Sequence, residues 1–143
     1  MLSKLYTEQL NLVDTGYFSA LVTDYVAQAS FFEPFIQAFP SPNAMAKAFE
    51  TKEKQIIHRA VLVDALKAQY AHLPNTEKAW GQMDRLLEST TFTVCTAHQP
   101  ILFLGPLYVI YKTVHAIQLA NALNAQFPEK HVVPVFYMGT EDH

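Results

Sequence analysis

The spacing of the apolar residues changes well past the middle of the chain. Up to residue 90, apolar residues recur three and four positions apart, which is typical of helices that bury one face. Over residues 91–96 and again over 131–138, β-branched and aromatic residues dominate, which favours strands. The pattern therefore predicts an α/β protein with a helical region over residues 1–90 and a strand–helix–strand unit over residues 91–143.

Short breaks divide the first region into several helices. Apolar and aromatic residues from Phe31 to Phe39 surround Pro34, and we interpret this cluster as packing core, or as a partner surface if it proves to be exposed. We predict no direct chemistry in this region. Helices are expected after Gly16 through Val26, from Pro42 with Ser41 as its N-cap, from about His58 to Ala71, and from Asn75 or Thr76 through Leu87.

The second region has the pattern of a βαβ unit. Its second strand, His131–Met138, is almost continuously apolar, which suits a strand covered on both faces. Pro134 does not fit easily in a strand, because proline has no backbone N–H to donate to a neighbouring strand. Either the strand begins near Pro134, or the N–H position of that residue faces no partner strand. A helix of about twenty residues is predicted in between, with Pro106 at its first position and Phe127 at its end. One face of this helix is traced by Leu107, Ile110, Val114, Ile117 and Asn121, and Val109, Leu119 and Leu123 widen its apolar stripe. Only Lys112 is charged, so we expect the helix to be covered on several sides.

Composition narrows the function classes. The 143 residues suit one ordinary domain, and a net charge of −3 gives no electrostatic reason to expect nucleic acid as a partner. The single cysteine, Cys95, excludes an internal disulfide, and we expect it to be a buried thiol in the first strand. Apolar stretches are too short to span a bilayer. Without a secretory signal pattern, the cytoplasm is the expected location.

Candidate chemistry gathers where the two strands end. The turn between the first strand and the helix carries His98, Gln99 and Gly105, next to a helix N-terminus whose free N–H groups favour anions. His98 can donate to a phosphate or act as an acid or base near neutral pH. Tyr108 and Lys112 lie one helical turn apart and could point toward the same pocket, although Lys112 is equally well explained as a surface lysine. Neither a Walker loop nor a GxGxxG motif is present.

Glu141, Asp142 and His143 follow the second strand directly. Alone, such a cluster is better explained as a solvated tail. Because the carboxyl ends of parallel strands share one edge of a sheet, ligands bind there in open α/β sheets. Together with the His98 turn, these residues favour a binding site for a substrate amine, a ribose hydroxyl or Mg²⁺.

Several of these segments, in this order and spacing, resemble one enzyme family. The residues are CTAHQP, GPLYVIYK, IQLANAL, VVPVFYMG and TEDH. They are similar to the N-terminal part of the bacillithiol biosynthesis cysteine-adding enzymes, the cysteine ligases of that pathway. The first ninety residues fit that family more loosely, and Ala97 stands where many members have glycine.

The resemblance implies a Rossmann-like core of the class I synthetase type, of which residues 91–143 would be the first βαβ unit. It implies a ligase that adds cysteine to glucosaminyl-malate. ATP, with Mg²⁺, would first activate the cysteine carboxylate, and the intact protein would be a homodimer. His98 and Gln99 would be catalytic, and Gly105, Tyr108, Lys112, Glu141, Asp142 and His143 would bind substrate or nucleotide. Because family members are several times longer, we expect an N-terminal piece, truncated in its core and inactive alone.

Two other interpretations stay open. One is a different nucleotidyl-transfer or metal-assisted enzyme on the same unit, with His98, Glu141 and His143 as metal ligands. Protein-bound zinc needs three well-placed and supported ligands, and the spacing of Glu141 and His143 gives little reason to expect a metal site. The other is a non-catalytic helical interaction module. Further α/β sequence after His143 would favour the ligase.

Overall fold

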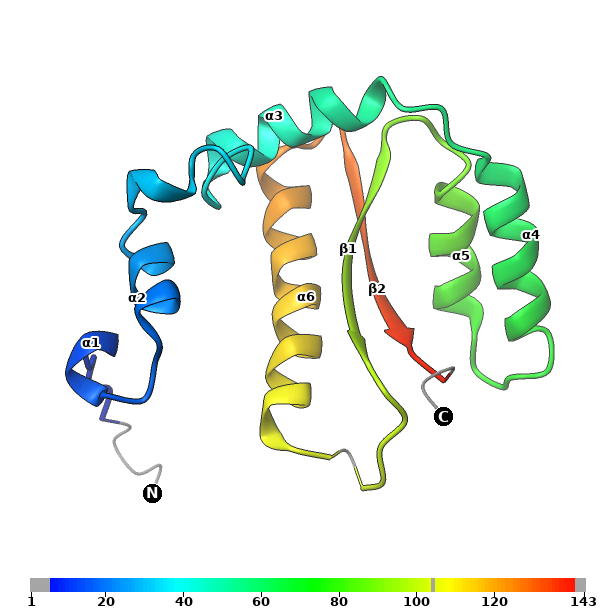
Figure 1. Ribbon diagram of the computed structural model, residues 1–143. Coiled ribbons are helices and arrows are strands. Elements are labelled where there is room, and N and C mark those ends of the chain that lie inside the picture. Colours follow the sequence, from blue (N-terminus) through cyan, green and yellow to red (C-terminus); the bar gives the residue numbers. More distant parts are fainter. Residues whose placement is uncertain (1–5, 104, 141–143) are drawn as a thin grey trace. The chain divides into compact units, whose positions relative to one another are not determined.

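The chain folds into two compact units that meet in sequence between Ala48 and Phe49. A computed structural model describes residues 6–103 and 105–140 (Figure 1). The contacts thus place the predicted helices after residue 49 in the same unit as the βαβ segment. The boundary expected near residue 90 stays a prediction about the domains of the protein.

The first unit consists of short helices around an aromatic cluster. Its elements are α1 (Leu12–Thr15), α2 (Ala20–Val26), the 3₁₀ turn η1 (Ser30–Phe32) and the start of α3 (Pro42–Glu53). Ser41 caps α3 as predicted, since its Oγ accepts from Ala44 N at 3.1 Å. Phe32 is buried among the rings of Tyr25, Phe31 and Phe39, whereas Phe31 and Phe35 are exposed. The cluster is therefore core at Phe32 and surface at its rim.

The second unit is a two-stranded parallel sheet between helices. Its elements are α4 (Arg59–Tyr70), α5 (Glu77–Arg85), β1 (Thr91–His98), α6 (Leu107–Gln126) and β2 (His131–Met138). β1 and β2 pair in register from Thr91 opposite His131 to His98 opposite Met138. α6 lies on one side of the sheet, and α4 and α5 lie on the other (Figure 1). The predicted βαβ unit is confirmed, with α6 starting one residue later than expected.

Alternation along the strands assigns each sheet face its own helices. Val133 of β2 is buried with Val63, Met83 and Leu86 of the α4–α5 side, and Val135 packs against the same cluster. The other face meets α6 and aromatic rings at its amino end. There the ring of Phe49, in α3, contacts Phe92 in a tilted arrangement at 4.6 Å and Phe127 edge to face at 5.3 Å between ring centroids.

α6 is covered on fewer sides than predicted. Its buried residues are Val109, Ala116, Ala120 and Leu123, of which Val109 and Leu123 belong to the predicted stripe, whereas Leu107, Ile110, Val114 and Ile117 are exposed. Small side chains at Ala116 and Ala120 let the helix backbone approach the sheet closely. The helix is apolar nearly all round, so its periodicity could not identify the inner face. No described helix combines the length and hydropathy of a membrane crossing.

Pro134 faces away from β1, which settles the two alternatives raised by the sequence. His131 N donates to Thr90 O and Gly139 N donates to His98 O, so odd-numbered residues of β2 point their N–H groups at β1. Even-numbered residues point outward, as Val132 does. Pro134 therefore costs no hydrogen bond with β1, and the strand begins before it, at His131.

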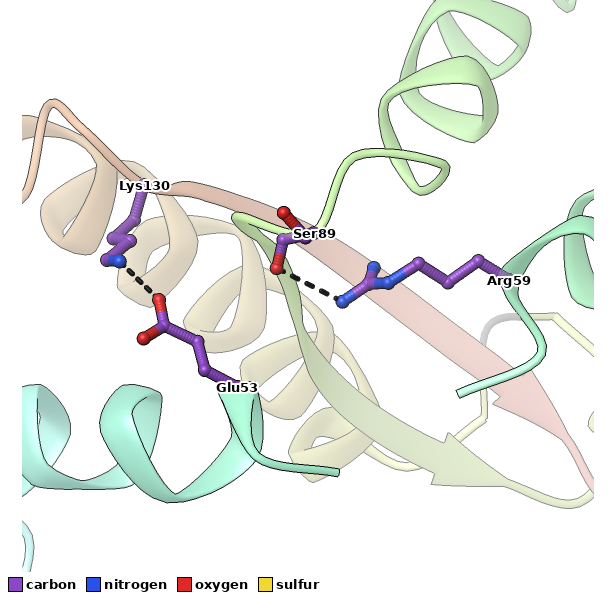
Figure 2. Close-up of polar contacts among 4 residues, drawn as sticks. All are labelled: Glu53, Arg59, Ser89 and Lys130. Atoms are coloured by element: carbon purple, nitrogen blue, oxygen red, sulfur yellow. Dashed lines mark hydrogen bonds and ion pairs between the residues drawn. The ribbon is translucent and has the colours of Figure 1, made fainter. Parts of the chain in front are cut away.

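Two basic side chains tie the helices to the loops at the amino ends of the strands (Figure 2). The Arg59 guanidinium donates to the carbonyls of Leu86 at 2.9 Å, Thr91 at 3.0 Å and Ser89 at 3.3 Å. Lys130, just before β2, forms an ion pair with Glu53 at the end of α3. Arg59 thus holds the carbonyls around the α5–β1 loop, and Lys130 joins the start of β2 to α3. The sequence pattern indicated neither contact.

Acid is expected to destabilise this unit partly through His131. Burial, and next the Arg85 guanidinium, lower the pKa of His131 below 6.5, while Glu88 opposes them. Its Nε2 lies 2.9 Å from Gln82 Oε1. Because the unfolded chain then binds the proton more readily, this contribution to stability is present above pH 6.5 and is lost as the pH falls toward the folded pKa. His131→Gln should shrink the loss of unfolding free energy between about pH 7.5 and 5.5. An unchanged pH dependence would contradict the assignment.

Candidate functional site

The carboxyl ends of the two strands lie side by side. His98, the last residue of β1, pairs with Met138, the last residue of β2, and the carbonyl of His98 accepts from Gly139 N at 3.1 Å. The turn after β1 and the segment after β2 therefore leave the sheet at the same edge, as predicted. Glu141, Asp142 and His143 lie outside the described residues, so their place in a site stays a prediction.

The structure brings His98 and Tyr108 into direct contact. The Nε2 atom of His98 lies 2.9 Å from the Tyr108 hydroxyl, in the first turn of α6, and the two ring centroids are 5.5 Å apart. The Nδ1 atom lies 2.9 Å from the carbonyl oxygen of Gln99. His98 is partly buried, whereas Gln99 and Tyr108 are exposed. Thus the His98 ring orientation is set by a strand-end backbone group on one side and by a helix side chain on the other.

Lys112 also reaches this edge. Its ammonium donates to the carbonyl of Ala97 at 2.6 Å and lies 5.9 Å from the centroid of the Tyr108 ring. The lysine thus spans from α6 to the end of β1. A cation, an imidazole, a phenol and the N-terminal end of α6 together suit an anionic ligand such as a phosphate or carboxylate. Within residues 6–103 and 105–140, no three His, Cys, Asp or Glu side chains group as metal ligands.

Gly105 has a conformational reason to be glycine. Its φ is +60°, in the left-handed region, and a Cβ there would lie 2.5 Å from Ile101 Cδ1. The predicted close approach to a ligand is untested, because the atom that occupies this space is from Ile101. Phe103 in the same turn also has a positive φ, of 52°, and its side chain is 96% exposed. A phenylalanine gives no sequence signal for this conformation, so this strained position was missed.

Gly105→Ala is expected to lower the free energy of unfolding by about 1–2 kcal/mol, because a Cβ is disfavoured at this φ and meets Ile101. Gly81→Ala is the matched control. Gly81 lies inside α5, its φ is not positive, and nothing lies within 4 Å of the added Cβ, so alanine should stabilise by about 0.5–1 kcal/mol. Urea unfolding followed by Trp80 fluorescence measures both. Equal effects of the two substitutions would contradict the assigned strain.

Cys95 is exposed, so the expected buried thiol is wrong. The cluster that covers the α4–α5 face of the sheet includes Val133 and Val135 of β2 and no residue of β1. Cys95 pairs with Val135 and points to that face, outside the cluster. It also borders an open groove of about 800 Å³ beside α6, with Tyr111, Lys112 and Leu119 among the residues on the helix side. Nothing in the geometry marks the thiol as a nucleophile.

The same segments that form this edge match a known family. The family model for the N-terminal Rossmann-like domain of the bacillithiol biosynthesis protein BshC matches residues 5–143. The chain belongs to the BshC family. The predicted resemblance and the Rossmann-like α/β class are thereby confirmed, with an incomplete sheet of two strands in the described residues.

Curated BshC relatives match nearly the whole chain. Proteins named "putative cysteine ligase BshC" are 41% identical in Cytophaga hutchinsonii, over 99% of this chain, and 35% identical in Christiangramia forsetii, over 96%. The one from Heliobacterium modesticaldum is 36% identical over 88%. The matched regions are 27%, 26% and 24% of these relatives. The chain thus spans about a quarter of the length of the BshC proteins it matches.

Proposed function

We propose that the protein containing this chain is a cysteine ligase that joins cysteine to glucosaminyl-malate, the last step in making bacillithiol. The family match over residues 5–143 is the observation that carries this proposal. A BshC protein would work on small molecules, and we place it in the cytoplasm as a homodimer. The described edge would supply one wall of the pocket, with Glu141, Asp142 and His143 as a second wall.

ATP with Mg²⁺ is the proposed activating cosubstrate. The cysteine carboxylate would attack the α-phosphate of ATP and release pyrophosphate, and the glucosaminyl amine would then attack the adenylate carbonyl, releasing AMP and a proton. Support comes from the groups gathered at the strand end, namely Tyr108, Lys112 and the first turn of α6, because negative charge develops on phosphate oxygens. His98 and Gln99 are proposed to act in catalysis, and Gly105, Tyr108 and Lys112 are proposed to bind substrate.

The direct test uses the full-length protein with cysteine, glucosaminyl-malate, ATP and Mg²⁺. We expect a new thiol of the condensed mass by mass spectrometry, together with equal amounts of AMP and pyrophosphate. Absence of the thiol would refute the ligase, whereas ADP and phosphate would refute only the adenylate. We expect the 143-residue chain alone to be inactive and to bind ATP weakly or not at all by calorimetry, since it matches about a quarter of its relatives.

A further inference from the structure

Both ring nitrogens of His98 already have hydrogen-bonding partners. A carbonyl oxygen can only accept, so the Nδ1 atom, 2.9 Å from the Gln99 carbonyl, must carry a proton. In the neutral ring the Nε2 atom therefore has a lone pair, and the Tyr108 hydroxyl, 2.9 Å away, donates to it. The two partners thus select the Nδ1–H tautomer and leave neither nitrogen available to a ligand.

Of the two residues, Tyr108 is the one that can still form a further hydrogen bond. A phenol has one donor and two acceptor lone pairs, and Tyr108 is 53% exposed, whereas His98 is partly buried. When His98 is protonated, its Nε2–H can donate only to the phenol oxygen, and the Tyr108 O–H is released to donate elsewhere. The Lys112 ammonium, 5.9 Å from the Tyr108 ring centroid, adds a positive charge near that ring.

We propose that Tyr108 is the residue that donates to the anionic substrate and that His98 is a positioning residue, which orients and polarises the Tyr108 hydroxyl through their hydrogen bond. This inference rests on the proposed ligase and assigns its substrate contact. Protonated His98, Tyr108 and a substrate oxygen would form a chain of two hydrogen bonds, with no net proton transfer. Such a chain is stronger than an isolated phenol contact, because each donor polarises the next.

A double-mutant cycle on the full-length protein tests the pair. Tyr108→Phe keeps the ring beside Lys112 and removes only the hydroxyl, which is the group proposed to touch the substrate, so we expect kcat/KM to fall about 10²- to 10³-fold. Adding Tyr108→Phe to His98→Ala should cost less than about threefold more, because partners that act as a unit are non-additive. Multiplicative losses would overturn the proposal. Tyr111→Phe, an exposed tyrosine on the same helix, should leave turnover unchanged.

A readout that does not depend on turnover separates this inference from the proposed function. With ¹⁵N-labelled histidine, NMR of the wild-type protein should show neutral His98 as the Nδ1–H tautomer. In Tyr108→Phe the Gln99 carbonyl still selects Nδ1–H, but the unprotonated Nε2 loses its hydrogen-bond donor, so its ¹⁵N resonance should move toward that of a free, unprotonated imidazole nitrogen. Nε2–H in the wild type, or an unchanged Nε2 resonance on substitution, would overturn the pair. If the wild type makes no thiol, the ligase fails while this measurement still decides the contact.

Discussion

Asn124→Ala is expected to lower the free energy of unfolding of the βαβ unit by about 2–4 kcal/mol. The Asn124 side chain on α6 makes two hydrogen bonds with one residue of β2. Its Oδ1 accepts from Val132 N at 2.7 Å, and its Nδ2 donates to Val132 O at 2.9 Å. Val132 is only 2% exposed and directs both groups away from β1. Alanine would leave a donor and an acceptor unpaired in a buried position, each at about 1–3 kcal/mol.

Asn121 supplies a matched control, one helical turn earlier on α6. It is the same residue type in the same helix, and it is exposed. Any gain in helix propensity from asparagine to alanine is shared, so the difference between the two variants isolates the contact with Val132. Urea unfolding followed by fluorescence of Trp80, the single tryptophan, measures this difference. Variants that differ by less than about 0.5 kcal/mol would show that the contact contributes little.

Local signals in the sequence were enough to predict the order of the helices and strands from α2 onward, although α1 was not predicted. Runs of β-branched residues indicated β1 and β2, and β2 has the predicted bounds of His131–Met138. Ser41 before Pro42 marked the start of α3, and Phe127 marked the end of α6. Each of these signals acts within a few residues of chain, because caps and backbone propensities are local properties.

Features that depend on tertiary packing were not predictable in the same way. The buried face of α6 includes Ala116 and Ala120, whose small side chains allow close packing although they are only weakly hydrophobic. Cys95 was expected to be buried, yet its exposure depends on which strand the helices cover. The role of Asn124 was not predicted, because its partner is the backbone of Val132, which lies beyond the loop that follows α6. A residue's own type gives no information about such partners.

The position of the candidate site was predicted from the sequence, but the contacts between its side chains were not. Parallel strands had to end at one edge, so the turn at His98 and the end of β2 were expected together, and they lie together. Helical spacing put Tyr108 and Lys112 on one face of α6, but it could not say that Tyr108 bonds His98 or that Lys112 bonds Ala97. Those contacts depend on the path of the turn, where Phe103 and Gly105 adopt left-handed conformations.

His98→Ala in the full-length protein is expected to lower kcat for thiol formation about 10²- to 10³-fold, corresponding to about 3–4 kcal/mol of transition-state stabilisation. The substitution removes the imidazole that holds the Tyr108 hydroxyl and the positive charge that a protonated ring brings to the strand end. The loss should fall mainly on kcat, since this charge matters most when negative charge develops on the phosphate. The ring also bonds the Gln99 carbonyl, so the turn must be shown to stay folded.

His115→Ala is the control for that experiment. His115 is an exposed histidine on α6 that lines the groove with Cys95 and lies outside the His98–Tyr108 contact. It should retain kcat within about twofold and have an unfolding midpoint close to that of the wild type. His98→Gln adds a further comparison, because an amide can still bond Tyr108 but cannot carry a positive charge; it should restore the fold without restoring turnover. Full turnover in His98→Ala would remove His98 from the site, and recovery in His98→Gln would show that its role is hydrogen bonding and not charge.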